Sequence, residues 1–209
     1  MKAPSCWPFF RELVERPVVE SMHELSLHIM DIAENGISAG ATLIEIAVTE
    51  DMKKNELKIT LRDNGRGMSK ERMKKVMDPF FTTRTTRRVG LGLSLFKEAS
   101  KRCEGEFRLQ SEEGKGTEVM ATFRLDHIDL APMGNIAGAL TTLIMGNPEV
   151  EFLYTHEIGG EDLVIDTRDI KNELDGLTIN DPHVIKYLAD MIRESLADLR
   201  QGKEEEPHG

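Results

Sequence analysis

The residues best suited to chemistry lie in four short blocks in the first two-thirds of the chain. In the first block, Asp31 and Asn35 stand four residues apart in a segment with helical periodicity, so both side chains project from one face of the helix. A carboxylate beside an amide oxygen offers the hard oxygen ligands that Mg²⁺ takes in proteins, and the carboxylate can orient or deprotonate a water or hydroxyl. Solvated helix surfaces also carry such pairs, so this block alone does not establish a site.

The second block is a glycine-containing turn, residues 63–68, at the end of a predicted strand. Gly65 and Gly67 permit positive φ angles and a close approach of a ligand to the backbone. Asp63, fixed at the strand end, can accept a hydrogen bond from an exocyclic amine such as that of adenine. A plain turn stabilised by the aspartate side chain is the alternative.

The third block combines cations with glycines. Arg84, Arg87 and Arg88 have no acidic residue among them and offer charge-assisted hydrogen bonds to phosphate oxygens. Gly90 and Gly92 follow at the start of a predicted helix, whose N-terminal amides and dipole favour an anion. A solvated basic loop is the alternative, but the glycines at the helix start favour phosphate.

The fourth block is Gly114-Lys115-Gly116-Thr117, which allows tight backbone packing beside a pocket or forms an ordinary hairpin turn. Common nucleotide signatures are missing from the sequence. A P-loop has Ser or Thr directly after its Lys, whereas Lys115 is followed by Gly116, and no GxGxxG pattern occurs. The sequence therefore predicts neither a P-loop nor a Rossmann nucleotide site.

The elements expected to position these blocks are helices alternating with pairs of strands. Apolar residues at spacings of three and four predict helices over 22–36, 69–77, 91–102, 132–145, 170–174 and 182–199. Alternating patterns predict strands over 44–48, 57–61, 106–111, 117–125, 151–156 and 161–167. Consecutive strand pairs favour an α+β fold, a two-layer α/β sandwich with helices covering one face of a mixed sheet.

The composition excludes several classes of protein. The chain has 209 residues and two cysteines, Cys6 and Cys103, which are too few for a disulfide framework or a structural zinc site. No apolar run approaches the roughly 18–20 residues of a membrane helix, and the charged N-terminal stretch does not resemble a signal peptide. We therefore expect a cytoplasmic protein without a membrane segment.

The net charge of −10 is divided unevenly along the chain. Residues 1–125 have a net charge of +2, whereas residues 126–209 have −12. Two units with different partners would have such asymmetry, and so would solvated faces that simply differ in sign. The asymmetry also argues against nucleic-acid binding, because the acidic part repels phosphate.

The order of the four blocks is more specific than any single block. It resembles the ATP-binding domain shared by DNA gyrase, ninety-kilodalton heat-shock chaperones, histidine kinases and mismatch-repair ATPases, the GHKL superfamily. The resemblance covers about half the chain and implies a Bergerat-type ATP-binding fold. The N box resembles residues 31–35, the G1 box 63–67, the F box 78–83, the G2 box 90–95 and the closing Gly-x-Gly-Thr box 114–117.

The resemblance implies a site for ATP and Mg²⁺, in which Asn35 binds the metal and Asp63 binds the adenine amine. Members that hydrolyse ATP place a Glu one turn before the Asn, but Asp31 stands there, one methylene shorter. Glu34 is adjacent to Asn35 but points about 100° away on an ideal helix. Asp31 and Glu34 are therefore the catalytic candidates, and ATP binding is better supported than turnover.

The nucleotide-binding residues implied by the resemblance come from all four blocks. Residues 82–89 would form a lid over the phosphates, and residues 90–93 would approach the phosphates through their backbone. Histidine kinases often carry a Lys where this chain has Ser38. The implied set is Asn35, Ser38, Asp63, Gly65, Gly67, Met68, Phe80, Thr82, Thr83, Arg84, Arg87, Arg88, Gly90, Leu91, Gly92, Leu93 and Thr117.

Four segments follow from the blocks and the charge. We predict a flexible leader over 1–21, a histidine kinase-like ATP-binding domain over 22–126, a small acidic α+β unit over 127–200 and a disordered tail over 201–209. Met22 could equally be the natural start of the chain.

The function expected from the resemblance is that of a Mg-ATP-binding protein of histidine-kinase type. Such a protein, without its own dimerisation and phosphoacceptor domain, would phosphorylate a separate partner protein. The alternative is an ATP-gated switch of conformation or assembly with slow or no turnover. The acidic unit would dock the partner or form a homodimer. The pattern is also similar to small ATP-binding proteins of anaerobic bacteria, some of which accompany iron–sulfur hydrogenase or NADH-oxidoreductase subunits.

Overall fold

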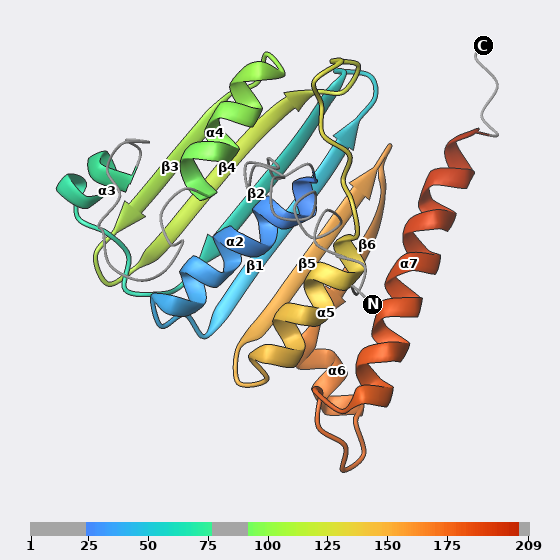
Figure 1. Cartoon of the computed structure of the whole chain (residues 1–209). Helices are drawn as coiled ribbons and strands as arrows, with labels where there is room; N and C mark the ends of the chain where they lie inside the picture. The colour runs from blue at the N-terminus through green and yellow to red at the C-terminus, as the bar shows by residue number, and fades with distance from the viewer. Residues whose placement is uncertain (1–23, 77–91, 205–209) are drawn as a thin grey trace, which may run out of the picture.

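A mixed sheet of six strands organises the protein (Figure 1). The structure is a computed structural model that describes residues 24–76 and 92–204. The strands are β1 (Leu43–Asp51), β2 (Glu56–Asp63), β3 (Phe107–Glu112), β4 (Gly116–Arg124), β5 (Glu151–Ile158) and β6 (Glu161–Asp166). Their order across the sheet is β3-β4-β2-β1-β5-β6, with β1 and β5 parallel and all other neighbours antiparallel.

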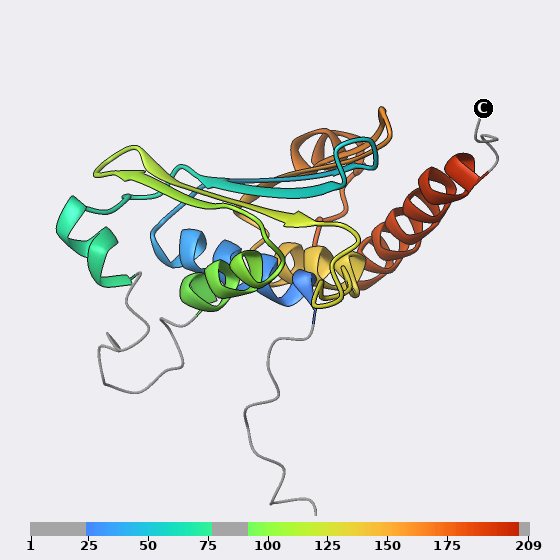
Figure 2. The same ribbon diagram turned by 90° about the horizontal axis from the view of Figure 1, so that it is seen from above.

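Helices pack against this sheet, most of them on one face. They are α2 (Leu25–Ser38), α3 (Lys70–Val76), α4 (Gly92–Arg102), α5 (Ile136–Gly146), α6 (Thr167–Glu173) and α7 (Pro182–Glu204). Seen from above, α2, α4 and α5 lie side by side beneath the strands, and α7 packs against α5 (Figure 2). The predicted α+β class and two-layer sandwich are therefore confirmed.

The alternation read from the sequence decides which side chains meet the helices. Along β1, Ile44, Ile46 and Val48 are buried at every second position, and β2 and β4 follow the same rule. Because opposed residues of neighbouring strands share a face of the sheet, these rows merge into one apolar surface under the helices. This surface forms most of the core.

The strand register also places a polar row at one end of the same face. Asp63 of β2 pairs with Ile44 of β1 on one side and with Thr117 of β4 on the other. Ser111 of β3 pairs with Thr117 in turn. Residues from three separate sequence blocks therefore lie next to one another, close to the C-terminal half of α2.

The acidic C-terminal part of the chain extends this sheet. β5 pairs along the full length of β1, from Leu43 opposite Glu151 to Glu50 opposite Ile158. α5 packs against α2, and a single cluster of buried apolar residues spans both parts of the chain. The change in charge near residue 126 is therefore a boundary in composition, because the segments on its two sides share one sheet and one core.

The sequence prediction for the start of α5 was wrong. The helix predicted from Pro132 begins at Ile136, and the side chain of Asn135 caps it by accepting a hydrogen bond from the backbone N–H of Gly138 at 3.0 Å. The carbonyl of Pro132 instead accepts a hydrogen bond from the backbone N–H of Leu25, at the start of α2. The segment before α5 thus satisfies a donor that α2 could not satisfy within its own helix.

The two predicted terminal segments differ in what the structure shows of them. α7 continues to Glu204, four residues past the end expected for the ordered part, so the predicted tail does not begin at Gln201. The predicted leader, residues 1–21, lies outside the described residues. In the ranges that the structure describes, every helix is too short or too polar to cross a bilayer.

A second polar group is buried on the helix-covered face, between β1, β5 and α7. The Tyr154 hydroxyl and His156 Nδ1 share a hydrogen bond of 2.7 Å, and His156 Nε2 and Glu50 Oε1 share one of 2.9 Å. Burial alone would raise the pKa of Glu50, but the hydrogen bond to His156 and the nearby Arg200 guanidinium bring this pKa below its ordinary value. Tyr154 and His156 are 1% and 0% exposed.

Candidate functional site

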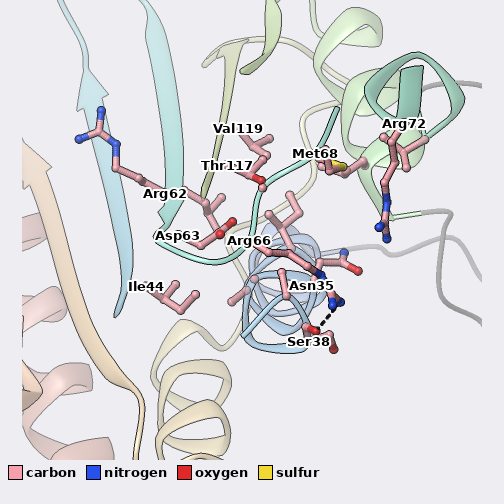
Figure 3. Close-up of a pocket in the computed structure, with 18 of the residues that line it drawn as sticks. Asn35, Ser38, Ile44, Arg62, Asp63, Arg66, Met68, Arg72, Thr117 and Val119 are labelled. Carbon is pink, nitrogen blue, oxygen red and sulfur yellow. Dashed lines mark hydrogen bonds between the residues drawn. The ribbon is translucent and has the colours of Figure 1, made fainter. Parts of the chain in front are cut away.

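A pocket of about 540 Å³ opens between α2, the turn after β2 and helix α3 (Figure 3). Ile44, Leu61 and Val119 form an apolar wall from three neighbouring strands. Asp63 and Thr117 add polar groups at the end of the same strands. The pocket therefore combines an apolar wall with polar groups at the strand ends, as small-molecule sites do. Charged side chains of the turn after β2 and of α3 also line it, namely Arg66, Glu71, Arg72 and Lys75.

Asp63 is the acidic group of the pocket. Its Oδ1 accepts a hydrogen bond from the backbone N–H of Gly65 at 2.9 Å, which fixes the direction of the carboxylate. Burial raises the pKa of Asp63, while the backbone N–H groups of Gly65 and Thr117 act in the opposite direction. A carboxylate held in this way can accept a hydrogen bond from an amine of a ligand.

Two glycines allow the turn after β2 to pack against the β3–β4 hairpin. Gly67 has a φ of +64°, and a Cβ there would lie 2.0 Å from the carbonyl oxygen of Glu112. Gly116 has a φ of +106°, and a Cβ there would lie 1.9 Å from the carbonyl oxygen of Asp63. Any larger residue at either position would separate the two backbones, so both glycines are required by the fold around the pocket.

Asn35 presents its amide oxygen rather than its amide nitrogen. Its Nδ2 donates a hydrogen bond to the backbone carbonyl of Asp31 at 2.8 Å, one turn earlier in α2. The nitrogen is therefore used within the helix, and the side-chain oxygen of this pocket-lining residue is left as an acceptor. Such an oxygen can join the coordination shell of a hard cation.

The side chain of Asp31, a residue of α2, lies against the start of α4. Its Oδ2 stands 1.5 Å from the position that a Cβ on Gly92 would occupy. Burial raises the pKa of Asp31, and the charge of Glu34 adds to this shift. Glu34 itself is exposed, in agreement with the direction expected on an ideal helix. Asp31 is thus partly buried against α4 and Glu34 is exposed, and neither is among the residues that line the pocket.

The family model for histidine kinase-, DNA gyrase B- and HSP90-like ATPases matches residues 18–127. The chain belongs to this ATPase family. The matched range contains every strand and helix that forms the pocket and stops close to the change in charge. The GHKL resemblance predicted from the four blocks is thereby confirmed.

Curated relatives match about half of the chain. The signal transduction histidine-protein kinase AtoS of Escherichia coli is 34% identical over 117 residues, which are 56% of this chain and 18% of that protein. Sporulation kinase E of Bacillus subtilis is 32% identical over 102 residues, which are 48% of this chain and 14% of that protein. The match thus spans less than a fifth of either kinase.

Two solved structures are similar in fold. The ATPase domain of MutL from Aquifex aeolicus, complexed with ADP, is 18% identical with a TM-score of 0.44, over 69% of this chain and 63% of that chain. The catalytic domain of the histidine kinase ThkA is 22% identical with a TM-score of 0.38, over 47% of this chain and 64% of that chain.

The structure brings many of the predicted binding residues of this ATPase domain to the pocket. Those that line it are Asn35, Ser38, Asp63, Gly67, Met68, Leu93 and Thr117. Gly65 lies beside the pocket and holds Asp63, and Gly92 lies against Asp31. Outside the described residues are Phe80, Thr82, Thr83, Arg84, Arg87, Arg88, Gly90 and Leu91. The individual ligand roles of all these residues remain predictions.

Other residues of the site were missed from the sequence. Ile44, Leu61 and Val119 form its wall, and only their inward position in each strand was predictable. Arg66 was read as part of a turn, yet its guanidinium donates a hydrogen bond to the carbonyl of Ser38 at 3.0 Å. This contact joins the turn after β2 to the end of α2, and no local sequence pattern indicates it.

Proposed function

We propose that this protein binds ATP together with Mg²⁺ in the pocket beside α2 and donates the terminal phosphoryl group to a separate partner protein. The observation that carries the proposal is the fixed pair of acceptors at the two sides of the pocket. The N–H of Gly65 fixes the Asp63 carboxylate, which can then accept from a base amine, and the hydrogen bond from Asn35 Nδ2 to Asp31 leaves the amide oxygen of Asn35 available to a cation. Membership of the ATPase family supports the choice of ATP.

The residues of the pocket fit this ligand. A volume of about 540 Å³ lies within the range of 300–1,000 Å³ found for small-molecule sites. Ile44, Leu61 and Val119 offer an apolar surface for a purine ring, next to the acceptor on Asp63. Gly36 also lines this wall, where a Cβ would lie 2.8 Å from the Asp63 side chain. The missing side chain at Gly36 leaves the space in front of Asp63 open.

Magnesium is proposed as an ion that arrives with the nucleotide. Within residues 24–76 and 92–204, no group of three or more His, Cys, Asp or Glu side chains is arranged to hold a metal ion. Asn35 would contribute one oxygen, and phosphate oxygens and waters would complete the octahedral shell that Mg²⁺ prefers. When bound, Mg-ATP supplies the phosphoryl group, and Asp31 is the residue proposed to orient or deprotonate its acceptor.

The second candidate function is an ATP-gated switch with slow or no turnover. The observation that favours it is the position of Asp31, whose short side chain lies against Gly92 at the start of α4. A nucleotide that moves α4 would also move this contact, without any transfer of phosphate. In either case the acidic part over 127–200 would dock the partner or a second copy of the chain, and iron–sulfur hydrogenase or NADH-oxidoreductase subunits are partners to test.

ATP binding is tested by calorimetry with Mg-ATP on the whole chain. Asp63→Ala should abolish measurable binding, because it removes the acceptor for the base amine. Asp166→Ala is a matched control, since Asp166 also ends a strand and accepts a backbone N–H, that of Arg168, at 2.9 Å. The control should bind Mg-ATP like the wild type. Equal affinities for wild type and Asp63→Ala would overturn the proposal.

The two candidate functions differ in what happens to the phosphoryl group. A pull-down with and without Mg-ATP, followed by phosphosite mapping on the captured protein, should find a phosphorylated side chain if transfer occurs. If ATP binds and changes assembly but yields neither ADP nor phosphoprotein, the protein is a switch.

A further inference from the structure

We infer that Ser111, which belongs to none of the predicted binding blocks, sets the base preference of the pocket by fixing the hydroxyl hydrogen of Thr117. The inference rests on the proposed nucleotide function and adds a positioning residue to it. Ser111 lies on β3, opposite Thr117 of β4, which in turn lies opposite Asp63 of β2. The three side chains form the polar row at the end of the sheet.

The hydroxyl of Ser111 has three partners at hydrogen-bond distance. It accepts a hydrogen bond from the backbone N–H of Met68 at 2.8 Å and donates one to the carbonyl of Gly116 at 2.9 Å. Its Oγ also lies 2.9 Å from Oγ1 of Thr117. These contacts link the turn after β2 to the β3–β4 hairpin.

Counting donors and acceptors assigns the hydrogen of each hydroxyl. A serine hydroxyl has one hydrogen and two lone pairs. The carbonyl of Gly116 can only accept, so it takes the hydrogen of Ser111, and the N–H of Met68 takes one lone pair. The remaining lone pair faces Thr117, and the contact between the two hydroxyls therefore requires Thr117 to donate its own hydrogen to Ser111.

The consequence for the pocket is that Thr117 presents lone pairs and no hydrogen. Its neighbour in the register, Asp63, presents a carboxylate. The polar end of the pocket is thus built from acceptors, which favours a base edge carrying an amine. A base with a carbonyl at the same position would place its oxygen, an acceptor, against the acceptors of the protein. No hydrogen bond could form there, and buried polar groups would be left unpaired. The geometry points to adenine over hypoxanthine or guanine.

The experiment measures the dissociation constants of Mg-ATP and Mg-ITP, which differ in the amine or carbonyl at position 6 of the base. The wild type should bind ATP at least about tenfold more tightly, the equivalent of one hydrogen bond. Ser111→Ala frees the Thr117 hydroxyl to rotate and donate to the ITP carbonyl. The preference for ATP over ITP should therefore fall by about tenfold in this variant. The main reason is that Ser111→Ala should bind ITP more tightly than the wild type does.

A matched control separates this role from structural support. The Ser100 hydroxyl also links the two strands of the β3–β4 hairpin, because its Oγ lies 2.9 Å from the carbonyl oxygens of Glu106 and Thr122. Ser100 is not among the residues that line the pocket. Ser100→Ala should lower the melting temperature and leave the ratio of ATP to ITP affinity unchanged. A purely structural Ser111 would behave in the same way.

Thr117→Val provides a second route should Ser111→Ala fold poorly. It removes the hydroxyl while keeping the side-chain shape, and it should reduce the preference as well. If Ser111 acts through Thr117, the double variant should have the same ratio as Thr117→Val alone. An unchanged ratio in Ser111→Ala, or additive effects in the double variant, would overturn the inference while leaving ATP binding intact. Failure of the wild type to bind either nucleotide would overturn the proposed function and the inference with it.

Discussion

Two polar groups on the helix-covered face of the same sheet differ in how completely they are hydrogen-bonded within the protein. At the end of β2 and β4, Asp63 and Thr117 are held on one side by backbone and side-chain partners and face a pocket on the other. Between β1 and β5, Tyr154, His156 and Glu50 form a chain in which each member has a partner. Partial pairing leaves acceptors for a ligand, whereas complete pairing in the core serves stability.

The difference arises from what covers the sheet. Beside β5 and β6, helix α7 packs against both β6 and α5 (Figure 1), and the Tyr154 and His156 side chains are buried there. Near Asp63 the pocket lies between α2, the turn after β2 and α3, which packs beside β3. The pocket is therefore a gap in the helix layer over an otherwise continuous apolar face.

The largest effect should come from removing the C-terminal part. A chain ending at residue 126 loses β5, which pairs along the length of β1, and α5, which packs on α2. We expect no cooperative unfolding transition and no Mg-ATP binding, measured by circular dichroism during urea titration and by calorimetry. A truncated chain that folds and binds Mg-ATP like the full chain would show that the charge boundary also divides the fold.

His156→Ala should cost about 3 kcal/mol of unfolding free energy, because it leaves the buried Tyr154 hydroxyl and Glu50 without their partner and opens a cavity. Asp63→Ala, in the open group, should cost less than about 1 kcal/mol. Urea unfolding of both variants measures the contrast. Similar losses in the two variants would mean that the open group is also structural.

His28 should make the unfolding free energy fall in acid. Burial, with the charge of Arg102, lowers the pKa of His28 from its ordinary 6.5 to about 4, and in the described part of the chain its Nδ1 has no hydrogen-bond partner. Above pH 6.5 both states are neutral and the effect is absent. Below it the unfolded chain gains a proton that the folded chain takes up only near pH 4, so about 3 kcal/mol is lost across this window.

Urea unfolding between pH 7 and pH 4 measures this loss. His28→Leu should flatten the dependence in that window, whereas His183→Leu, at an exposed histidine of α7, should leave the dependence as in the wild type. An unaltered slope in His28→Leu would assign the acid sensitivity to other groups.

Gly92→Ala should lower the free energy of unfolding by about 1–2 kcal/mol. Its Cβ would lie 1.5 Å from Asp31 Oδ2, so the carboxylate must move away from α4. Asp31→Gly in the same chain removes the obstructing side chain and should recover most of the lost free energy of unfolding. If the double variant is no more stable than Gly92→Ala, the contact between Asp31 and Gly92 does not limit the packing of α4.

Most of the elements, and the four blocks, could be predicted from local patterns. The alternation of apolar and polar residues predicted which side chains of β1 and β2 point inward. The spacing of Asp31 and Asn35 predicted that they share one face of a helix. Both predictions depend only on backbone periodicity. The start of α5 could not be predicted, since Pro132 satisfies a donor of α2 that lies more than a hundred residues earlier. Ser111 carried no signal, because its role depends on two other strands.

By itself, the sequence determined the α+β class, the ATPase family and the residues around Asp63 and Asn35. These predictions follow from residue patterns within short segments and from the order of the four blocks along the chain. Only the tertiary structure decided that the acidic part completes the same sheet through β1 and β5, and that Ser111 meets Thr117 beside Asp63. Strand pairing joins residues far apart in sequence, so their contacts depend on register and packing rather than on any local pattern.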